Sequence, residues 1–419
     1  STPDIRIFHL MIMLSILFLN RPTFQKLENN ILDNIVRFFL VLICFMSGFH
    51  MIFSWEEIAM SGGDASSLDI FAGVVILFLI LEATRRGIGL LLSIICLIFF
   101  TYPFYSHFLG GVFYSKGYSL QRMAEFLTTT SQGVYGIPLG VSASYIILFS
   151  IYGSFLSQFG AGEFFFKLAM RITKNMHAAS AKTAVIFSTL LGMISGSAAG
   201  NVAVTGTLTI PMMKKEGYQN HQAGAIEAVV STGGQIMPPV MGAAAFIMAE
   251  IIGKPYTEIM KAGLLPALLF FASTFFVVHF QAKKNGLKPK KYKDDGESTI
   301  MILLNGLQFI IPFLSLIGMM LYGYSPFKAS FFSIIILLSL NFLWNRKISF
   351  DFLMNCQKAI VEGTKNIVPI AVACAAAGII AGTLGITGLG SKISGLILTW
   401  SLGIPILALF MTMVVAIIL

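Results

Sequence analysis

Charged residues are scarce in this chain. They make up 11% of its 419 residues, whereas about 25% is usual for a soluble domain. Hydrophobic residues make up 56%, and the mean hydropathy is +0.83. This composition excludes an ordinary soluble domain. It predicts an all-α polytopic membrane protein, because long apolar runs cross a bilayer as helices.

The net charge of +9 does not indicate nucleic-acid binding. Six lysines lie in one short segment, 283–293, and most other basic residues lie near the ends of apolar runs. This distribution is typical of the positive-inside signal that orients membrane proteins. We therefore expect membrane lipid, and no nucleic acid, among the partners.

Sequence patterns for metal, redox and nucleotide chemistry are also lacking. The four cysteines lie in or beside apolar runs without CxxC spacing, so we interpret them as small core residues. The six histidines show no metal-ligand spacing, and no usable Walker or GxGxxG pattern is present. No set of nucleophile, base or metal ligands is visible. We predict no enzyme activity and no cofactor.

Apolar runs long enough to cross the membrane are plentiful. A bilayer core of about 30 Å needs about 20 helical residues. Runs of about this length predict spans at 5–20, 34–54, 68–82, 87–106, 136–159, 258–281, 299–323 and 326–345. Between them, the aromatic and mildly amphipathic segment 107–135 is predicted to lie at the external interface.

The stretch Leu190–Glu250 is apolar but repeatedly interrupted. It contains GSAAGN, STGGQ and a Pro-Pro pair. Irregular backbone at membrane depth is tolerated only where protein covers it or water reaches it. We predict a re-entrant hairpin at 183–213, which begins and ends near basic residues, and a broken helix at 218–252. Together they form a candidate binding site.

The hairpin tip carries small and polar residues. Ser195, Ser197, Asn201 and Thr205 are the polar candidates, because hydroxyls and carbonyls suit a hard monovalent cation such as Na⁺. The N-terminal ends of half-helices suit a carboxylate. The alternative is helix packing through small residues, with hydroxyls bonded to their own backbone.

The broken helix offers a second set of polar groups. Ser231, Thr232 and Gln235 are expected to line its break, since Gly233-Gly234 and Pro238-Pro239 prevent a continuous helix. The alternative is a proline kink that serves packing only. Glu227 lies within the apolar stretch, where it could bind a cation or a proton, or complete a structural network.

Segments 138–170 and 367–398 share a pattern. Each has a proline, a span rich in small residues, a Gly-x-Gly and an amphipathic segment, so Gly160 aligns with Gly388. The charge pattern runs the two spans in opposite directions, which predicts inverted repeats of the kind that build secondary transporters. The sequence stops where the second hairpin tip is expected. Both ends look cut, and we expect a longer polypeptide.

At these residues the sequence resembles the membrane component of TRAP (tripartite ATP-independent periplasmic) transporters, especially fused permeases of the TAXI type. The resemblance covers nearly the whole chain. It rests on LDIFAGVVILFLILEATRRGIG (68–89), SGSAAGNVAVTGTLTIPMMKKEGY (195–218), AGAIEAVVSTGGQIMPPVMGAAAFIMAE (223–250) and TGLGSKI (387–393).

The charge pattern, the repeats and the resemblance together imply four regions. Residues 1–135 would be small-subunit-like scaffold spans with the external segment, and 136–281 the first transport repeat. Residues 282–298 would be a cytoplasmic Lys-rich linker. Residues 299–419 would hold further scaffold spans and the second inverted repeat, truncated before its hairpin tip.

The resemblance also implies an activity: elevator-type, sodium-coupled import of a small organic anion bearing a carboxylate across the bacterial inner membrane. A periplasmic substrate-binding protein would deliver the anion, and Na⁺ would be the coupling ion. An ion-coupled transporter without a binding protein is the nearest alternative, and a channel is another.

Residue by residue, the family's sodium site maps onto Ser195, Gly196 and Ser197 with Ser231, Thr232, Gly233 and Gly234. We assign the substrate to five further residues of the two interruptions, and Glu227 to ion or proton coupling. The substrate residues are Asn201, Thr205, Gln235, Pro238 and Pro239.

Overall fold

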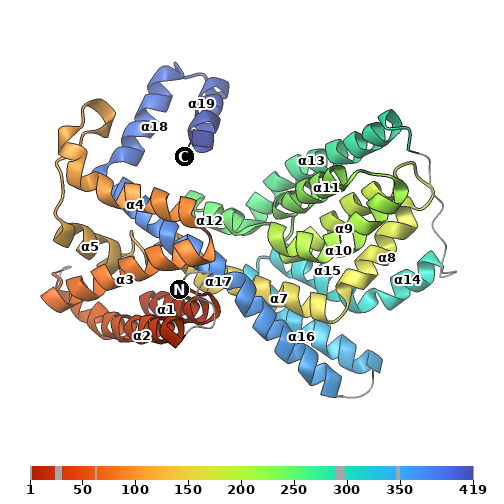
Figure 1. Ribbon diagram of the computed structural model, residues 1–419, viewed down its shortest axis with the longest axis horizontal. Coiled ribbons are helices and arrows are strands. Elements are labelled where there is room, and N and C mark those ends of the chain that lie inside the picture. Colours follow the sequence, from red (N-terminus) through yellow and green to blue (C-terminus); the bar gives the residue numbers. More distant parts are fainter. Residues whose placement is uncertain (1, 24–30, 62–63, 288–297, 346–349, 419) are drawn as a thin grey trace. The chain divides into compact units, whose positions relative to one another are not determined.

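The computed structural model describes residues 2–23, 31–61, 64–287, 298–345 and 350–418, and every regular element in them is helical (Figure 1). Within these residues, eight helices are long and apolar enough to cross a membrane, and one bent helix pair would be a ninth. The prediction of an all-α polytopic membrane protein is confirmed. The predicted linker 282–298 lies largely outside the described residues.

The chain divides into two compact units: Ser1–Ala143 with Val368–Leu419, and Ser144–Ile367. The boundary at residues 143 and 144 falls within a π-helical turn, Ser142–Ile146, that separates helices α6 (Ile137–Val141) and α7 (Ile147–Gln158). Such turns interrupt the regular helix ladder.

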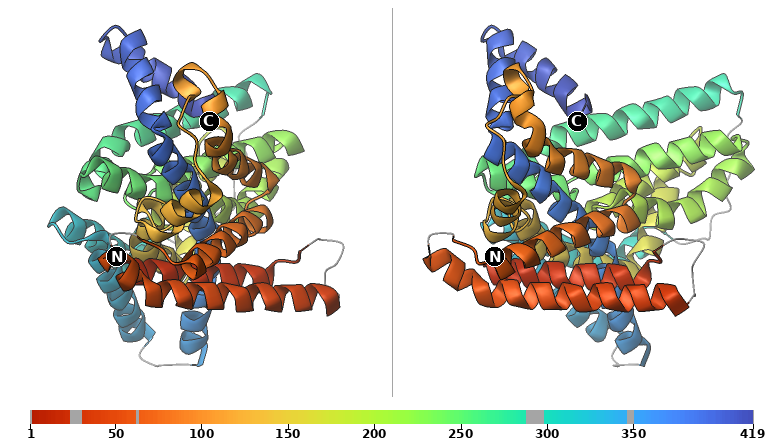
Figure 2. Two further views of the ribbon diagram at one scale, coloured as in Figure 1. Left: turned by 90° about the vertical axis from the view of Figure 1, so that its left-hand side faces the viewer. Right: turned by 60° about the vertical axis from the view of Figure 1, so that its left-hand side comes forward.

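The first unit begins with four long helices: α1 (Pro3–Asn20), α2 (Ile31–Met60), α3 (Ser67–Gly87) and α4 (Leu90–Tyr105). Helices α1 and α2 run side by side (Figure 2). A capping box between Ser66 and Asp69 starts α3. A buried polar contact joins two distant segments of this unit: His9 Nε2 lies 3.0 Å from Ser142 Oγ.

The expected interfacial segment 107–135 holds two short 3₁₀ turns and the amphipathic helix α5 (Leu120–Thr129). The unit ends with helices α18 (Leu389–Trp400) and α19 (Pro405–Ile418). Cys44, Cys96 and Cys374 are buried and Cys356 is half-buried, and all four are free.

The second unit contains the central stretch. Helices α8 (Ala161–Thr173), α9 (Ala179–Ser195), α10 (Ala198–Glu216), α11 (Asn220–Gly233) and α13 (Tyr256–Lys284) pack together (Figure 1). Alanine-rich faces form much of their core, including Ala181, Ala184, Ala223 and Ala267. Small side chains let these helices approach closely.

The expected span 299–323 is not straight. Helix α14 (Thr299–Asn305) and helix α15 (Leu307–Leu321) meet at Gly306 with a bend of 65°. A Cβ atom at Gly306 would lie 2.0 Å from the Phe164 ring, so this approach requires glycine. Helix α16 (Pro326–Asn345) then packs against α15.

Helix α17 (Phe350–Thr387) is the longest element. It is followed by Gly388, which has a left-handed φ of +66°, much as α7 is followed after one residue by Gly160 with φ +100°. Both glycines precede the next amphipathic helix. The aligned positions of the two predicted repeats therefore share a local conformation, although Pro369 lies inside α17 whereas Pro138 starts α6.

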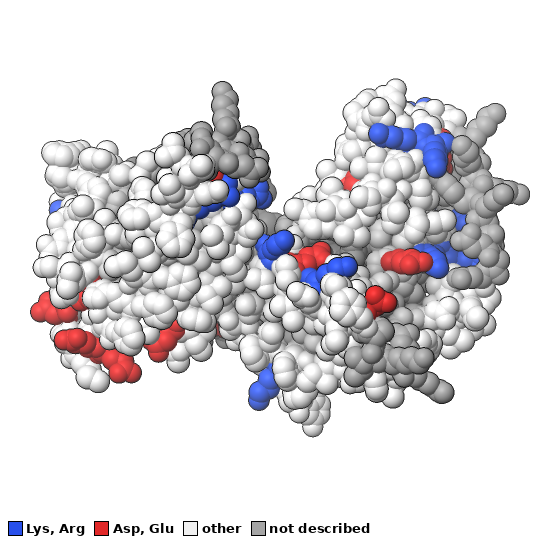
Figure 3. Space-filling model, turned by 60° about the horizontal axis from the view of Figure 1, so that its bottom comes forward, with Lys and Arg blue, Asp and Glu red and all other residues white. Residues whose placement is uncertain are grey.

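The described surface suits a lipid environment. The face in Figure 3 is mostly neither acidic nor basic, and bulky apolar side chains such as Phe53, Leu265 and Phe276 are exposed. Exposed apolar area on this scale is unusual for a soluble monomer.

Candidate functional site

Two residues interrupt the predicted hairpin. Helix α9 ends at Ser195, and helix α10 starts at Ala198. Gly196 ends α9 in the left-handed region, with φ +59°, a conformation that glycine adopts without strain. Ser197 caps α10, since its hydroxyl accepts a hydrogen bond from the Gly200 N–H at 3.2 Å.

The second interruption is longer. Helix α11 ends at Gly233, a 3₁₀ turn covers Gly234–Ile236, and helix α12 (Ala243–Ile252) begins after six further residues. The Tyr256 hydroxyl lies 2.9 Å from the Pro239 carbonyl oxygen and 2.5 Å from that of Val240. A buried tyrosine thereby supplies a donor for backbone carbonyls that no helix satisfies.

The two interruptions meet. A Cβ atom at Gly192 would lie 2.4 Å from Gly234 Cα, and one at Gly196 would lie 2.1 Å from the Met241 carbonyl oxygen. The backbones of α9 and of the second break are therefore in direct contact. Glycine at Gly192 and Gly234 makes this approach sterically allowed.

A buried carboxylate lies at the centre of the α9–α10–α11 bundle. Glu227 is 1% exposed. Its carboxylate accepts hydrogen bonds from the Thr205, Thr209 and Ser231 hydroxyls, the last at 2.9 Å. Thr205 and Thr209 are four residues apart on α10, and Glu227 and Ser231 are four residues apart on α11. Residues at this spacing lie on the same face of a helix.

Further polar atoms complete this cluster. The Ser188 hydroxyl of α9 lies 3.4 Å from those of Thr205 and Ser231. The Asn201 amide Nδ2 donates to the Ser188 carbonyl oxygen at 3.0 Å. Its Oδ1 is buried and has no hydrogen-bond partner among the described residues. We call Ser188, Asn201, Thr205, Thr209, Glu227 and Ser231 the carboxylate cluster.

The cluster contains a negative group without a cationic partner. In the described part of the chain, none of the ion pairs involves Glu227. An unpaired buried carboxylate is costly unless it is neutralised or binds a cation. The arrangement can therefore bind a positive charge, as a cation or as a proton.

The predicted site residues fall into two groups around this cluster. Asn201, Thr205, Glu227 and Ser231 come together in it. Ser195, Gly196 and Ser197 lie at the tip instead, and the Ser195 hydroxyl is buried with no partner among the described residues.

The predicted site residues of the second break are partly buried and partly exposed. Gly233 and Gly234 are buried at the close approach, and Pro238 and Pro239 are buried beyond it. Thr232 is exposed and donates to the Ala228 carbonyl oxygen of its own helix at 2.7 Å, and Gln235 is also exposed.

Sequence reasoning missed Ser188 and Thr209. Both lie on apolar helices, where a hydroxyl commonly bonds to its own backbone. The spacing of Asn201, Thr205 and Thr209 by four residues was the available signal, because it places three polar groups on one face of a membrane helix.

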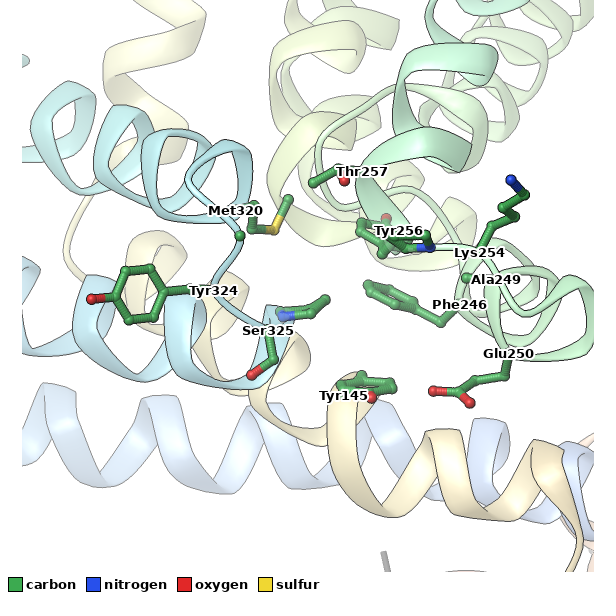
Figure 4. A pocket seen from close by; sticks show the side chains of 13 residues that line it. Tyr145, Phe246, Ala249, Glu250, Lys254, Tyr256, Thr257, Met320, Tyr324 and Ser325 are labelled. Carbon is green, nitrogen blue, oxygen red and sulfur yellow. The ribbon is translucent and has the colours of Figure 1, made fainter.

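An aromatic pocket of about 220 Å³ adjoins the second break within the same unit (Figure 4). Phe246 stacks on Tyr256 with ring centroids 4.1 Å apart, and Tyr145 stacks on Phe246 at 6.2 Å. Glu250 and Tyr324 are among the other side chains that line it (Figure 4). Tyr256 also donates hydrogen bonds to the Pro239 and Val240 carbonyl oxygens, so one side chain contacts both the pocket and the second break.

These features define a class. Interrupted helices that bring polar groups to the interior of a membrane bundle are typical of secondary transporters. The family model of the DctM component of the tripartite ATP-independent periplasmic transporters matches residues 75–419. The chain belongs to this family.

Curated relatives agree with the family. A putative TRAP transporter large permease of Haemophilus influenzae is 24% identical over 34% of this chain and 33% of its own length. The 2,3-diketo-L-gulonate TRAP transporter large permease YiaN of Escherichia coli is 23% identical, over 43% and 40%.

The uncharacterized protein y4mL of Sinorhizobium fredii is 22% identical over 53% of both chains. The chain thus spans about half the length of y4mL, and less of the other two relatives.

Three predictions are confirmed: a TRAP-family membrane protein, a member of a family of permeases rather than enzymes, and a multi-pass protein of a kind that resides in the bacterial inner membrane. The family match starts at residue 75, so the small-subunit-like character of residues 1–135 stays a prediction. The TAXI type, the domain boundaries and the assigned site residues stay predictions as well.

Proposed function

We propose that this protein imports a small organic anion bearing a carboxylate across the inner membrane, driven by a sodium gradient. The observation that carries the proposal is the contact between the two helix breaks, at Gly192 with Gly234 and at Gly196 with Met241. Such breaks expose helix-end N–H and C=O groups, which suit anions and cations respectively.

The substrate class is supported by a relative. YiaN is described as a transporter of 2,3-diketo-L-gulonate, an organic acid. The predicted substrate residues are Asn201, Thr205, Gln235, Pro238 and Pro239. Asn201 and Thr205 are fully buried in the carboxylate cluster, whereas Gln235, Pro238 and Pro239 lie at the second break. An exposed Gln235 amide and the buried prolines at the second break suit a ligand with a polar and an apolar side.

Sodium is the proposed coupling ion. Its tip site would use Ser195, Gly196 and Ser197 with the Ser231–Gly234 segment, largely through backbone carbonyls. The Ser195 hydroxyl supports this, because it is buried without a partner among the described residues. Glu227 would couple the movement of an ion or a proton to the same cycle.

A periplasmic substrate-binding protein would deliver the anion, as the tripartite family name implies. We further propose a fused, TAXI-type permease that works by an elevator motion of inverted repeats. The left-handed glycines at Gly160 and Gly388 support the repeats, since they occupy aligned positions.

Uptake of radiolabelled organic acids into proteoliposomes tests the proposal. We expect uptake to require both an inward sodium gradient and the binding protein. Uptake that ignores the sodium gradient would contradict coupling, whereas equal uptake without the binding protein would favour the alternative of an ion-coupled transporter that works without one. Uptake that only follows the substrate's own gradient would indicate a channel.

A further inference from the structure

The carboxylate cluster has a regular geometry. The hydroxyl oxygens of Ser188, Thr205 and Ser231 lie 3.4 Å from one another on all three sides of a triangle. Hydrogen bonds between hydroxyls are normally about 2.7–2.8 Å long. These three oxygens are therefore too far apart for good mutual hydrogen bonds, although all are buried.

A triangle of this size fits one face of an octahedral cation site. Three ligands on an octahedral face are separated by √2 times the metal–oxygen distance. Edges of 3.4 Å correspond to a metal–oxygen distance of about 2.4 Å, longer than the roughly 2.0–2.1 Å of Mg²⁺ and within the roughly 2.3–2.6 Å of Ca²⁺. Na⁺ has nearly the radius of Ca²⁺, whereas K⁺ is larger.

Charge selects between ions of equal size. An ionised Glu227 would supply one negative charge, and its hydrogen-bond partners Thr205, Thr209 and Ser231 are neutral. A monovalent cation would leave the buried cluster neutral. A divalent cation would leave one uncompensated positive charge, which is expensive to bury.

The cluster has fewer hydroxyl hydrogens than acceptor oxygens, which also favours a bound cation. Thr205 has one hydroxyl hydrogen but several acceptors within reach, among them the Asn201 carbonyl oxygen at 2.8 Å and Glu227. A cation in the cluster would be coordinated by the lone pairs of those oxygens that receive no hydrogen bond. The unpartnered Asn201 Oδ1 is a further oxygen with a free lone pair.

We propose that Ser188, Thr205, Ser231, Glu227 and Asn201 form a dehydrated binding site for a monovalent cation of the size of Na⁺. The site lies inside the α9–α10–α11 bundle and takes the Ser231 hydroxyl. The tip site would then keep Ser195–Ser197, the backbone of Ser231 and Thr232–Gly234. It assigns Asn201 and Thr205 to the cation rather than to the organic anion. Both proposals invoke sodium, but this one rests on the geometry of the cluster.

Sodium-dependent thermal stability of the purified full chain in detergent tests the site, at constant pH and ionic strength with choline as the replacement cation. A ligand that binds only the folded state raises the melting temperature. We expect saturable stabilisation by Na⁺, weaker by K⁺, with the half-saturating Na⁺ concentration raised at least about tenfold by Ser188→Ala, Thr205→Val and Glu227→Gln.

Thr207→Val is the matched control. Thr207 lies on the same helix but is exposed and donates to the Val204 carbonyl oxygen, so its removal should leave the half-saturating concentration unchanged. Ser188→Ala removes only one hydroxyl oxygen, so it is the variant to measure if Glu227→Gln does not fold.

Two results would overturn the site. The first is a sodium response that survives in all three site variants but disappears in Ser197→Ala, which would place the ion at the tip and leave the proposed function standing. The second is stability that rises with acid and ignores Na⁺, which would make Glu227 a proton site. Sodium binding as expected, with uptake that needs no sodium gradient, would instead remove only the proposed coupling.

Discussion

At the scale of single residues, glycine and hydroxyl positions define the candidate site. The sequence predicted the interruption at Ser195–Gly200, because small and polar residues interrupt an apolar run there. It could not predict that Ser188 and Thr209 would join Glu227, since a hydroxyl on an apolar helix has its own backbone as a default partner. Thr232 follows that default, whereas Ser231, one residue earlier, does not.

The close approach of Gly192 to Gly234 leads to a prediction. In Gly192→Ala, the new Cβ would lie 2.4 Å from Gly234 Cα, so the helices must separate. We expect a loss of about 1–3 kcal/mol in the free energy of unfolding, measured by thermal unfolding in detergent.

Gly224→Ala is the control for this substitution. A Cβ atom at Gly224, within α11, meets nothing within 4 Å. This variant should be as stable as the wild type or more stable by about 0.5–1 kcal/mol, because alanine favours a helix. If Gly192→Ala proves no less stable than Gly224→Ala, the proposed contact of the two breaks is wrong.

At the scale of elements, the sequence predicted the helix spans but not the bend between α14 and α15. Apolar runs placed α2, α3 and α16 to within a few residues at most ends, since length and hydropathy determine a span. At the bend, a Cβ atom at Gly306 would lie 2.0 Å from the ring of Phe164, which is more than 100 residues earlier in the chain. A glycine in an apolar run gives no sign of such a distant partner.

The second break yields an element-scale prediction. Tyr256→Phe removes the donor to the Pro239 and Val240 carbonyls, which costs about 1–3 kcal/mol when buried carbonyls are left unpaired. We expect faster hydrogen exchange at the Val240–Gly242 amides, measured by mass spectrometry.

Tyr324→Phe serves for comparison, because Tyr324 lines the same pocket but is 45% exposed. Its exchange pattern at 240–242 should match the wild type. Equal exchange in both variants would show that Tyr256 does not hold the break.

At the scale of the whole molecule, the family and the membrane setting follow from the sequence, whereas the coupling ion and the partner protein require experiment. Long motifs such as 223–250 made the family visible, and charge at span ends predicted the orientation. The charge pattern places the end of α13 in the cytoplasm and the turn between α15 and α16 outside.

Cysteine labelling tests this orientation. Single cysteines at Lys284 and Tyr322, in a background without the four native cysteines, should react with a membrane-impermeant maleimide from opposite sides. Tyr322 is 85% exposed, so its substitution should be tolerated. In intact cells only Tyr322→Cys should be labelled before permeabilisation; labelling of both from the same side would refute the orientation.

The central claim is that the buried carboxylate among the α9–α10–α11 hydroxyls is a working part of an ion-coupled transporter. The most direct measurement is sodium-driven uptake of organic acid in proteoliposomes by Glu227→Gln, compared with Glu250→Gln, whose carboxyl group is exposed. We predict that Glu227→Gln loses about tenfold or more of the sodium-driven rate, while Glu250→Gln keeps the wild-type rate. Uptake by Glu227→Gln at the wild-type rate, with the same dependence on sodium, would contradict the claim.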